Sequence, residues 1–131
     1  NDQGWLRAIH AVVPDLLGAF KPQFLVSQHG VDTHFEDPLA HLLVSLDGQR
    51  MAFEAIHRWA HRYAAGNWVA LGGGGYEWVD VVPRAWTHLI AEASGHPIPP
   101  ASELPTGFHE FVLNALGRQA PGRMSPRNCR H

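Results

Sequence analysis

The 131-residue sequence contains a single cysteine, Cys129, which lies in a polar tail. One thiol can form neither a disulfide framework nor a cysteine-built zinc site, so we expect a reducing, cytoplasmic setting. The chain also lacks any run of the roughly 18 to 20 apolar residues that a membrane span requires. No basic stretch leads into an apolar one at the start, so neither a span nor a signal peptide is expected.

Charge of one sign is also scarce. Ten Lys and Arg residues stand against twelve Asp and Glu residues, and no basic block could neutralise a row of phosphates, so direct binding to nucleic acid is not expected. What is present is a hydrophobic content of 45%, which is enough to bury the core of one domain, and ten histidines, which suggest a metal site.

Apolar residues at steps of three and four predict a first helix from Trp5 to Phe20, with Asp2 as its N-cap. A second helix is predicted after a turn at Asp47-Gly48, with Gly66 as its left-handed C-cap. A third is predicted from about Asp80 to Ala93, with Pro83 in its first turn and four residues facing inward: Val82, Trp86, Leu89 and Ile90.

Two short apolar runs, Gln23 to Gln28 and Trp68 to Leu71, predict buried strands between these helices. The alternation of helix and strand indicates an α/β fold with a parallel sheet flanked by helices. Ligands of such sheets bind beyond the carboxyl ends of the strands, which here lead into residues 30–38 and 72–78. Two strands make a poor free-standing parallel sheet, so more strands are expected upstream.

Several candidate ligands follow the first strand, in the segment Gln28 to Pro38. They could converge on a metal at the rim of the sheet. The alternative is structural: Asp37 starts a turn, Asp32 caps local amides, and His29 and His34 are surface residues. Spacing alone does not decide between the two interpretations.

The second strand runs into four glycines, Gly72 to Gly75, followed by Tyr76. Glycines allow unusual backbone conformations and the close approach of a ligand or of another chain segment. No Gly-Lys-Ser/Thr follows, and Glu77 occupies the position of the third Rossmann glycine, so this is not a phosphate loop. A tight turn without chemistry is the alternative to a phenol that donates to an oxyanion.

His57 and His61 lie four residues apart on the second predicted helix, a spacing that could hold a metal. The glutamate of that motif is missing, because Arg58 follows His57, so we interpret both as surface residues. The same interpretation covers the remaining histidines outside the rim: His10, His41, His88, His96, His109 and His131.

The stretches Phe24-Leu-Val-Ser-Gln-His-Gly-Val-Asp-Thr-His34, Asp37-Pro-Leu-Ala-His-Leu42, Leu71-Gly-Gly-Gly-Gly-Tyr76 and Arg84-Ala-Trp-Thr87 resemble the histone deacetylase family, in particular its acetoin utilization branch. The resemblance covers about residues 5 to 96. It implies that residues 1–96 are the C-terminal part of an arginase/deacetylase-type parallel sheet flanked by helices. Residues 97–131 form a Pro-rich tail, with a short helix expected from Phe108 to Leu116 and disorder from about Gly117.

The resemblance also implies site roles. Asp32 would be a ligand of a catalytic Zn²⁺, whereas Asp37 would not. Tyr76 would hydrogen-bond the substrate carbonyl and then the oxyanion, and Leu39 and Gly74 would line the acyl-lysine channel. The implied reaction is hydrolysis of acetyl-lysine, in a protein or a small acetylated amine, to an amine and acetate.

The sequence departs from the family in lacking the Asp-x-His pair that supplies two further ligands and the His-His general base. It also opens at Asn1 without a Met. We therefore expect a fragment of a longer enzyme, or a truncated member, that is inactive alone. The alternatives are a non-catalytic α/β interaction module and a histidine-based metal-binding protein. Exposed sheet edges would favour self-association.

Overall fold

The structure of the chain is a computed structural model that describes residues 1–125. The expectations for Cys129 and His131 lie outside the described residues. In chain order the elements are α1 Asp2–Phe20, β1 Leu25–Gln28, α2 Leu46–Ala64, β2 Trp68–Leu71, α3 Val82–Ala93 and α4 Thr106–Leu116. The predicted α/β class is confirmed.

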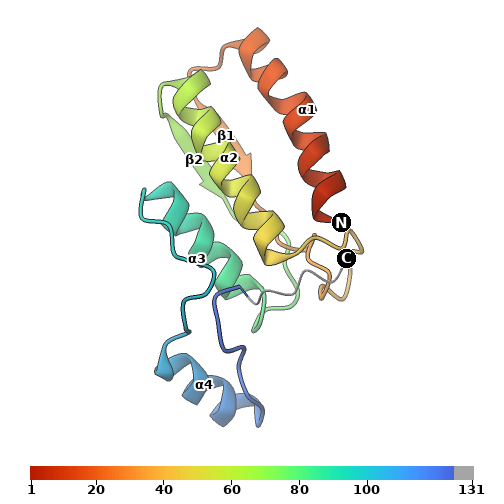
Figure 1. Cartoon of the computed structure of the whole chain (residues 1–131), viewed down its shortest axis with the longest axis vertical. Coiled ribbons are helices and arrows are strands. Elements are labelled where there is room, and N and C mark those ends of the chain that lie inside the picture. Colours follow the sequence, from red (N-terminus) through yellow and green to blue (C-terminus); the bar gives the residue numbers. More distant parts are fainter. Residues whose placement is uncertain (126–131) are drawn as a thin grey trace.

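Strands β1 and β2 form a parallel pair, in register from Leu25 opposite Trp68 to Gln28 opposite Leu71. Helix α2 is the crossover that a parallel pair requires. Figure 1 shows α2 over the strands, with α1 along one side of it and α3 on the other, and α2 packs against both helices. Both strands therefore end at the same edge of the sheet.

The two long helices begin at one shared contact. Asn1, not Asp2, caps α1, because its side chain accepts the N–H of Gly4. The Asp2 carboxylate instead accepts both the N–H and the hydroxyl of Ser45, at 2.7 and 2.6 Å. Ser45 is in turn the N-cap of α2. The predicted role of Asp2 is therefore wrong: it joins two helix starts.

The predicted ends of α2 also need correction. Asp47 and Gly48 lie inside its first turn, where an acidic residue suits the helix dipole, and they are not a preceding turn. At the other end Ala65 is the left-handed C-cap, with φ 51°, and Gly66 follows with φ 83°. The predicted C-cap, Gly66, therefore lies one residue beyond the observed C-cap, Ala65.

Helix α3 carries Pro83 in its first turn, as predicted. Its inner face differs from the prediction: Ile90 is 69% exposed, whereas His88 is 1% exposed although it was assigned to the surface. The buried positions 85, 88, 89 and 92 share one helical face, so residue 90 turns outward. Because this buried face also carries polar residues, the pattern of hydrophobic residues did not identify it.

A broad apolar surface stays uncovered. No residue of α1 is fully buried. The sheet is covered only on its face toward α2, and its other face is open. Outward-facing apolar side chains lie on α1 and around the strands: Val12, Leu16, Phe20, Phe24, Val26, Val69 and Leu71. Among the described residues, no helix is long and apolar enough to cross a membrane.

Helix α4 confirms the short helix predicted in the tail and begins two residues earlier than predicted, at Thr106. After α4 the chain runs back beside residues 100–104, which precede the helix, and Glu103 and Arg123 form an antiparallel bridge. Met124 is buried and its N–H donates to the carbonyl of Ser102 at 2.9 Å. For residues 117–125 this defined path differs from the disorder expected from Gly117, because backbone pairing and burial of Met124 hold the segment.

Candidate active site

The loops that follow the two strands lie against each other, as the parallel arrangement predicted. The N–H of His29 continues the ladder to the carbonyl of Leu71 at 2.8 Å. Beyond it, the N–H of Val31 donates to the carbonyl of Gly74 at 2.6 Å. The segment with Asp32 and the glycine run are therefore fixed to each other by backbone hydrogen bonds.

The glycine run is required for space. A Cβ added to Gly74 would lie 2.3 Å from Oδ2 of Asp32, and one added to Gly73 would lie 2.8 Å from the backbone nitrogen of Gly30. None of the four glycines has a positive φ. Of the two reasons considered from the sequence, close approach holds and an unusual backbone conformation does not.

Asp32 is half-buried beside Gly30 and Gly74. Within residues 1–125 its carboxylate makes none of the side-chain hydrogen bonds or ion pairs, so it does not cap local amides. A carboxylate held in place but without a donor suits a hard or borderline metal ion as a ligand. The described residues contain no group of three or more His, Cys, Asp or Glu placed to hold a metal, so a ligand role for Asp32 stays a prediction.

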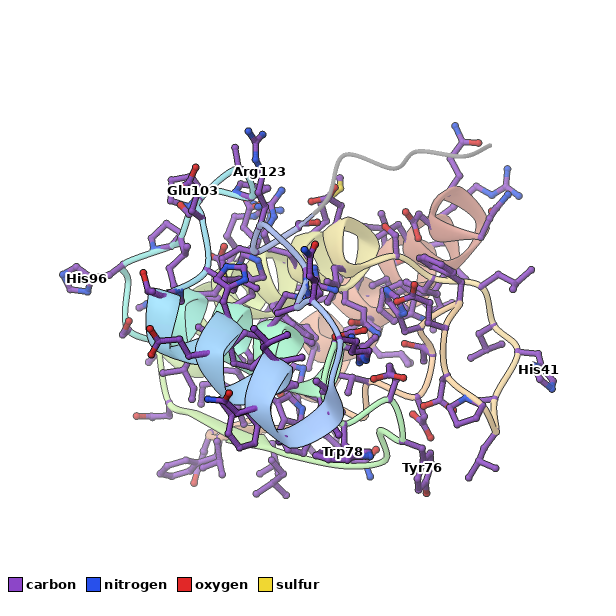
Figure 2. The ribbon with its side chains drawn as sticks, turned by 90° about the horizontal axis from the view of Figure 1, so that it is seen from below. His41, Tyr76, Trp78, His96, Glu103 and Arg123 are labelled. Carbon is purple, nitrogen blue, oxygen red and sulfur yellow. The ribbon has the colours of Figure 1, made fainter. Side chains whose placement is uncertain are left out.

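Tyr76 lies directly after the glycine run with its side chain 50% exposed. Figure 2 shows the phenol pointing away from the ribbon on the same side of the molecule as Trp78. Leu39 is 65% exposed on the neighbouring loop. The structure thus brings Asp32, Gly74 and Tyr76 together on adjoining loops and leaves the side chains of Tyr76 and Leu39 open to a ligand.

Asp37 is the residue whose importance the sequence did not reveal. It is 5% exposed, and its Oδ1 accepts the N–H groups of Leu39 and Ala40 at 2.9 and 3.1 Å. Its Oδ2 accepts the N–H of Tyr76 at 2.9 Å. Burial opposes ionisation, but these donors hold the pKa of Asp37 below its usual range. The turn predicted at Asp37 is present, and it is tied to the other loop.

The two histidines near Asp32 are buried, and the surface interpretation is wrong for both. Nε2 of His29 lies 2.7 Å from the hydroxyl of Ser27, and burial lowers the pKa of His29 to about 4. Nδ1 of His34 accepts the N–H of Glu36 at 3.2 Å. Burial, with the charge of Arg84, lowers the pKa of His34 to about 4. Both are neutral packing residues at neutral pH.

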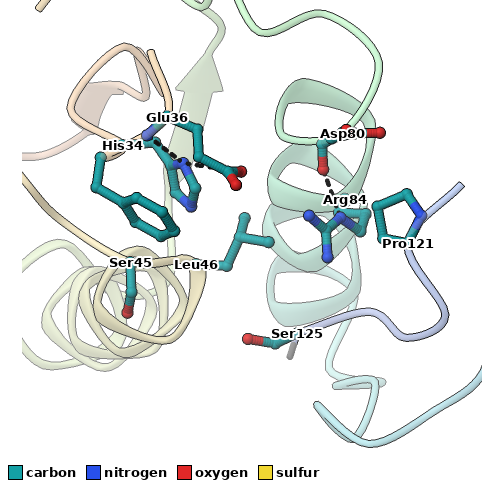
Figure 3. A pocket seen from close by; sticks show the side chains of 9 residues that line it. His34, Glu36, Ser45, Leu46, Asp80, Arg84, Pro121 and Ser125 are labelled. Atoms are coloured by element: carbon teal, nitrogen blue, oxygen red, sulfur yellow. Dashed lines mark hydrogen bonds and ion pairs between the residues drawn. The ribbon is translucent and has the colours of Figure 1, made fainter. Parts of the chain in front are cut away.

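His34 and Arg84 line a pocket beside the Asp32 loop (Figure 3). Arg84 is 4% exposed and donates Nε to the carbonyl of Asp80 and Nη1 to the carbonyl of Arg123. Asp32 does not line this pocket. Arg84 therefore joins α3 to the returning tail at this pocket, and His34 of the Asp32 loop lines the same pocket.

Two further side chains brace the Asp32 loop. Nε2 of Gln49, on α2, donates to the carbonyl of Val31 and to the hydroxyl of Thr33. Nε1 of Trp86, on α3, donates to the carbonyl of His29. The family-like Arg-Ala-Trp stretch pointed to Trp86, whereas nothing in the sequence marked Gln49, which carries no local motif.

His61 is exposed on α2, as predicted, whereas His57 is half-buried, and their Nε2 atoms lie 3.1 Å apart. His57 stacks on Trp68 with ring centroids 5.5 Å apart. The pair is only two side chains, and no third His, Cys, Asp or Glu of residues 1–125 completes a metal site around it. It gives no support to a histidine-based metal-binding protein.

Comparison with known proteins agrees with the α/β fold and with the loops at the edge of the sheet where β1 and β2 end. The histone deacetylase domain model matches residues 1–93, and the chain therefore belongs to the histone deacetylase family. It is 38% identical over 105 residues to the acetoin utilization protein AcuC of Bacillus subtilis (strain 168), which covers 80% of the chain and 27% of that protein. It is 36% identical over 105 residues to AcuC of Staphylococcus xylosus, with the same coverage.

A third relative, AcuC of Staphylococcus aureus (strain MRSA252), is 35% identical over 98 residues, which covers 75% of the chain and 25% of that protein. The chain thus spans about a quarter of the length of these relatives. The matches confirm the family and the branch that the sequence motifs suggested.

Proposed function

We propose that this chain is the part of a zinc-dependent deacetylase that supplies one metal ligand, Asp32, and one oxyanion donor, Tyr76. The substrate would be acetyl-lysine, in a protein or in a small acetylated amine, and the products an amine and acetate. The observation that carries the proposal is the carboxylate of Asp32, packed against Gly74 and without a hydrogen-bond donor among the described residues.

The chemistry of the donor supports this assignment. Zn²⁺, when bound, polarises an amide carbonyl and lowers the pKa of a water to about 7. Asp32 would contribute one oxygen ligand at a fixed place, because the backbone bond from Val31 to Gly74 holds its loop. A bound cation would give the Asp32 carboxylate the partner that it lacks among the described side chains.

Tyr76 would act on the substrate oxygen. Its phenol donates a hydrogen bond to the carbonyl, and the bond strengthens as negative charge develops on that oxygen in the transition state. Leu39 and Gly74 would line the channel for the lysine stem, Leu39 with an exposed apolar side chain and Gly74 with no side chain. This division suits a narrow apolar tube that ends at a polar centre.

These 131 residues should not catalyse the reaction alone, because a catalytic zinc centre needs three protein ligands and residues 1–125 contain no group of three His, Cys, Asp or Glu that could hold a metal. The other two ligands and the general base would come from outside this sequence. One observation favours the alternative, a non-catalytic interaction module: the open apolar face of α1 and the sheet could cover a partner protein.

The test is the intact mass and the zinc content of the protein as its host produces it. A mass more than twice 14.5 kDa together with about one zinc per chain would support the enzyme. In that protein Asp32→Ala should lose the zinc, whereas Asp15→Ala, a change on exposed α1, should keep it. A mass near 14.5 kDa without zinc would support the interaction module and overturn the enzyme.

A further inference from the structure

Asp37 uses its two carboxylate oxygens for two different loops. Oδ1 accepts the N–H groups of Leu39 and Ala40, which forms the turn of its own segment. Oδ2 accepts one donor, the N–H of Tyr76, from a loop 39 residues away in the sequence. A turn would need only the first oxygen, so the second is available for the contact between loops.

No ion pair accounts for this buried acid. Within residues 1–125 Asp37 forms no salt bridge, and its partners are backbone N–H groups. A carboxylate that accepts several N–H groups stays ionised, and charge-assisted hydrogen bonds of this type are about twice as strong as neutral ones. The backbone at Tyr76 is thereby held by an anion that is itself fixed to the Leu39 turn.

We propose that Asp37 is a positioning residue for the reaction: one buried carboxylate sets where the Tyr76 phenol stands relative to Leu39 in the channel wall. The inference rests on the proposed function. Asp37 touches neither substrate nor metal, and it acts through the backbone of Tyr76. A displacement of about 1 Å at a reacting group can cost about 100-fold in rate, so a single lost hydrogen bond at this point is sufficient to matter.

Asp37→Asn separates the two roles of the side chain. The amide oxygen of asparagine can still accept from Leu39 and Ala40, because Asn forms the same turn as Asp. Its amide nitrogen then faces the N–H of Tyr76, donor against donor, and the contact between loops is lost. Asp37→Ser is the second variant, with a short hydroxyl that serves the local turn and cannot span to Tyr76.

The experiment is a double-mutant cycle in the natural-length protein, with an acetyl-lysine peptide as substrate. Asp37→Asn should lower kcat by about 10- to 100-fold with KM changed less than about threefold. In a Tyr76→Phe background the same change should cost less than about threefold more, because the phenol it positions is already gone. Asp37→Ser, used if the asparagine variant fails to fold, should behave in the same way.

Two controls make the result specific. Asp2→Asn is the matched control, since Asp2 also accepts a backbone N–H, that of Ser45, but makes no contact with Tyr76. It should lower stability and leave kcat within about twofold. Amide hydrogen exchange is the readout independent of activity: in Asp37→Asn the N–H of Tyr76 should lose protection while those of Leu39 and Ala40 keep it.

The outcomes distinguish the two proposals. A normal kcat in Asp37→Asn, or a loss that simply multiplies with that of Tyr76→Phe, would overturn the positioning role and leave the proposed function intact. An unchanged rate in Tyr76→Phe would overturn the oxyanion role itself, and the inference with it.

Discussion

The backbone N–H of Tyr76 lies 2.9 Å from Oδ2 of Asp37, so two loops far apart in the sequence share one buried carboxylate. Asp32 occupies the same loop as Asp37, and Gly74 occupies the same loop as Tyr76. The contact therefore joins the segment with the proposed metal ligand to the segment with the proposed oxyanion donor. Each prediction below tests one part of this arrangement.

Tyr76→Phe should lower kcat of the natural-length protein by about 10² to 10³, the usual loss for one oxyanion donor. The ring remains, so the backbone contact to Asp37 should survive and the thermal midpoint should change little. Steady-state kinetics on an acetyl-lysine peptide measures the effect. A similar loss in Tyr63→Phe, a change at the C-terminal end of α2, would point to a general defect instead.

Gly74→Ala should weaken zinc binding. The new methyl group would lie 2.3 Å from Oδ2 of Asp32, so the carboxylate must move. Zinc titration against a chromogenic chelator measures the affinity, which we expect to fall at least 10-fold. Gly107→Ala is the control: a Cβ there meets nothing within 4 Å, and alanine in α4 should stabilise the helix by up to about 1 kcal/mol. Equal zinc affinities in the two variants would argue against Asp32 as a ligand.

Acidification should destabilise the chain through His29. The folded-state pKa is lowered to about 4 by burial, whereas the unfolded value is about 6.5. The unfolded state thus binds the proton first, so the stability held above pH 6.5 is lost as the pH falls toward 4, by up to about 1.4 kcal/mol per pH unit. Urea unfolding of wild type and His29→Gln at pH 7.5 and 5 isolates the effect. Identical pH dependence in both would contradict it.

The open apolar face should promote self-association. Val26 is 59% exposed on the uncovered side of the sheet, beside Val69 in register. Val26→Lys should reduce the sedimentation coefficient of the associated species and raise solubility. Ile90→Lys, an equally apolar change at a 69% exposed position of α3, should have a smaller effect. If both changes act alike, general surface hydrophobicity is responsible and the sheet face is not.

Local periodicity was sufficient for most of the fold. Trp68–Leu71 was predicted with its observed bounds, and the helices were placed to within a few residues. What failed depended on contacts distant in sequence. Asp2 looked like a cap because it precedes a helix, yet its partner is Ser45. His88 looked exposed because histidine is polar, yet it is buried near Arg50 of α2 and Met124 of the returning tail.

The site divides along the same line. The motifs, which are local patterns, are the basis for proposing Asp32, Tyr76, Leu39 and Gly74, and the roles of these residues stay predictions. The motif also set Asp37 aside as a non-ligand, and no local pattern could show that its second oxygen reaches Tyr76. Gln49 was missed for the same reason, because it acts on Val31 and Thr33 from the middle of a helix.

The crossover through α2 has a kinetic consequence. The Asp32 loop and the Tyr76 loop meet only after the whole intervening helix has formed and docked, and such nonlocal closure is slow compared with helix formation. The rim should therefore be among the last parts to assemble during synthesis. Transient undocking of α2 would remove the Gln49 contacts from the Asp32 loop, so substitutions at Phe53 or Ala55 in the buried face of α2 would loosen that loop without touching it.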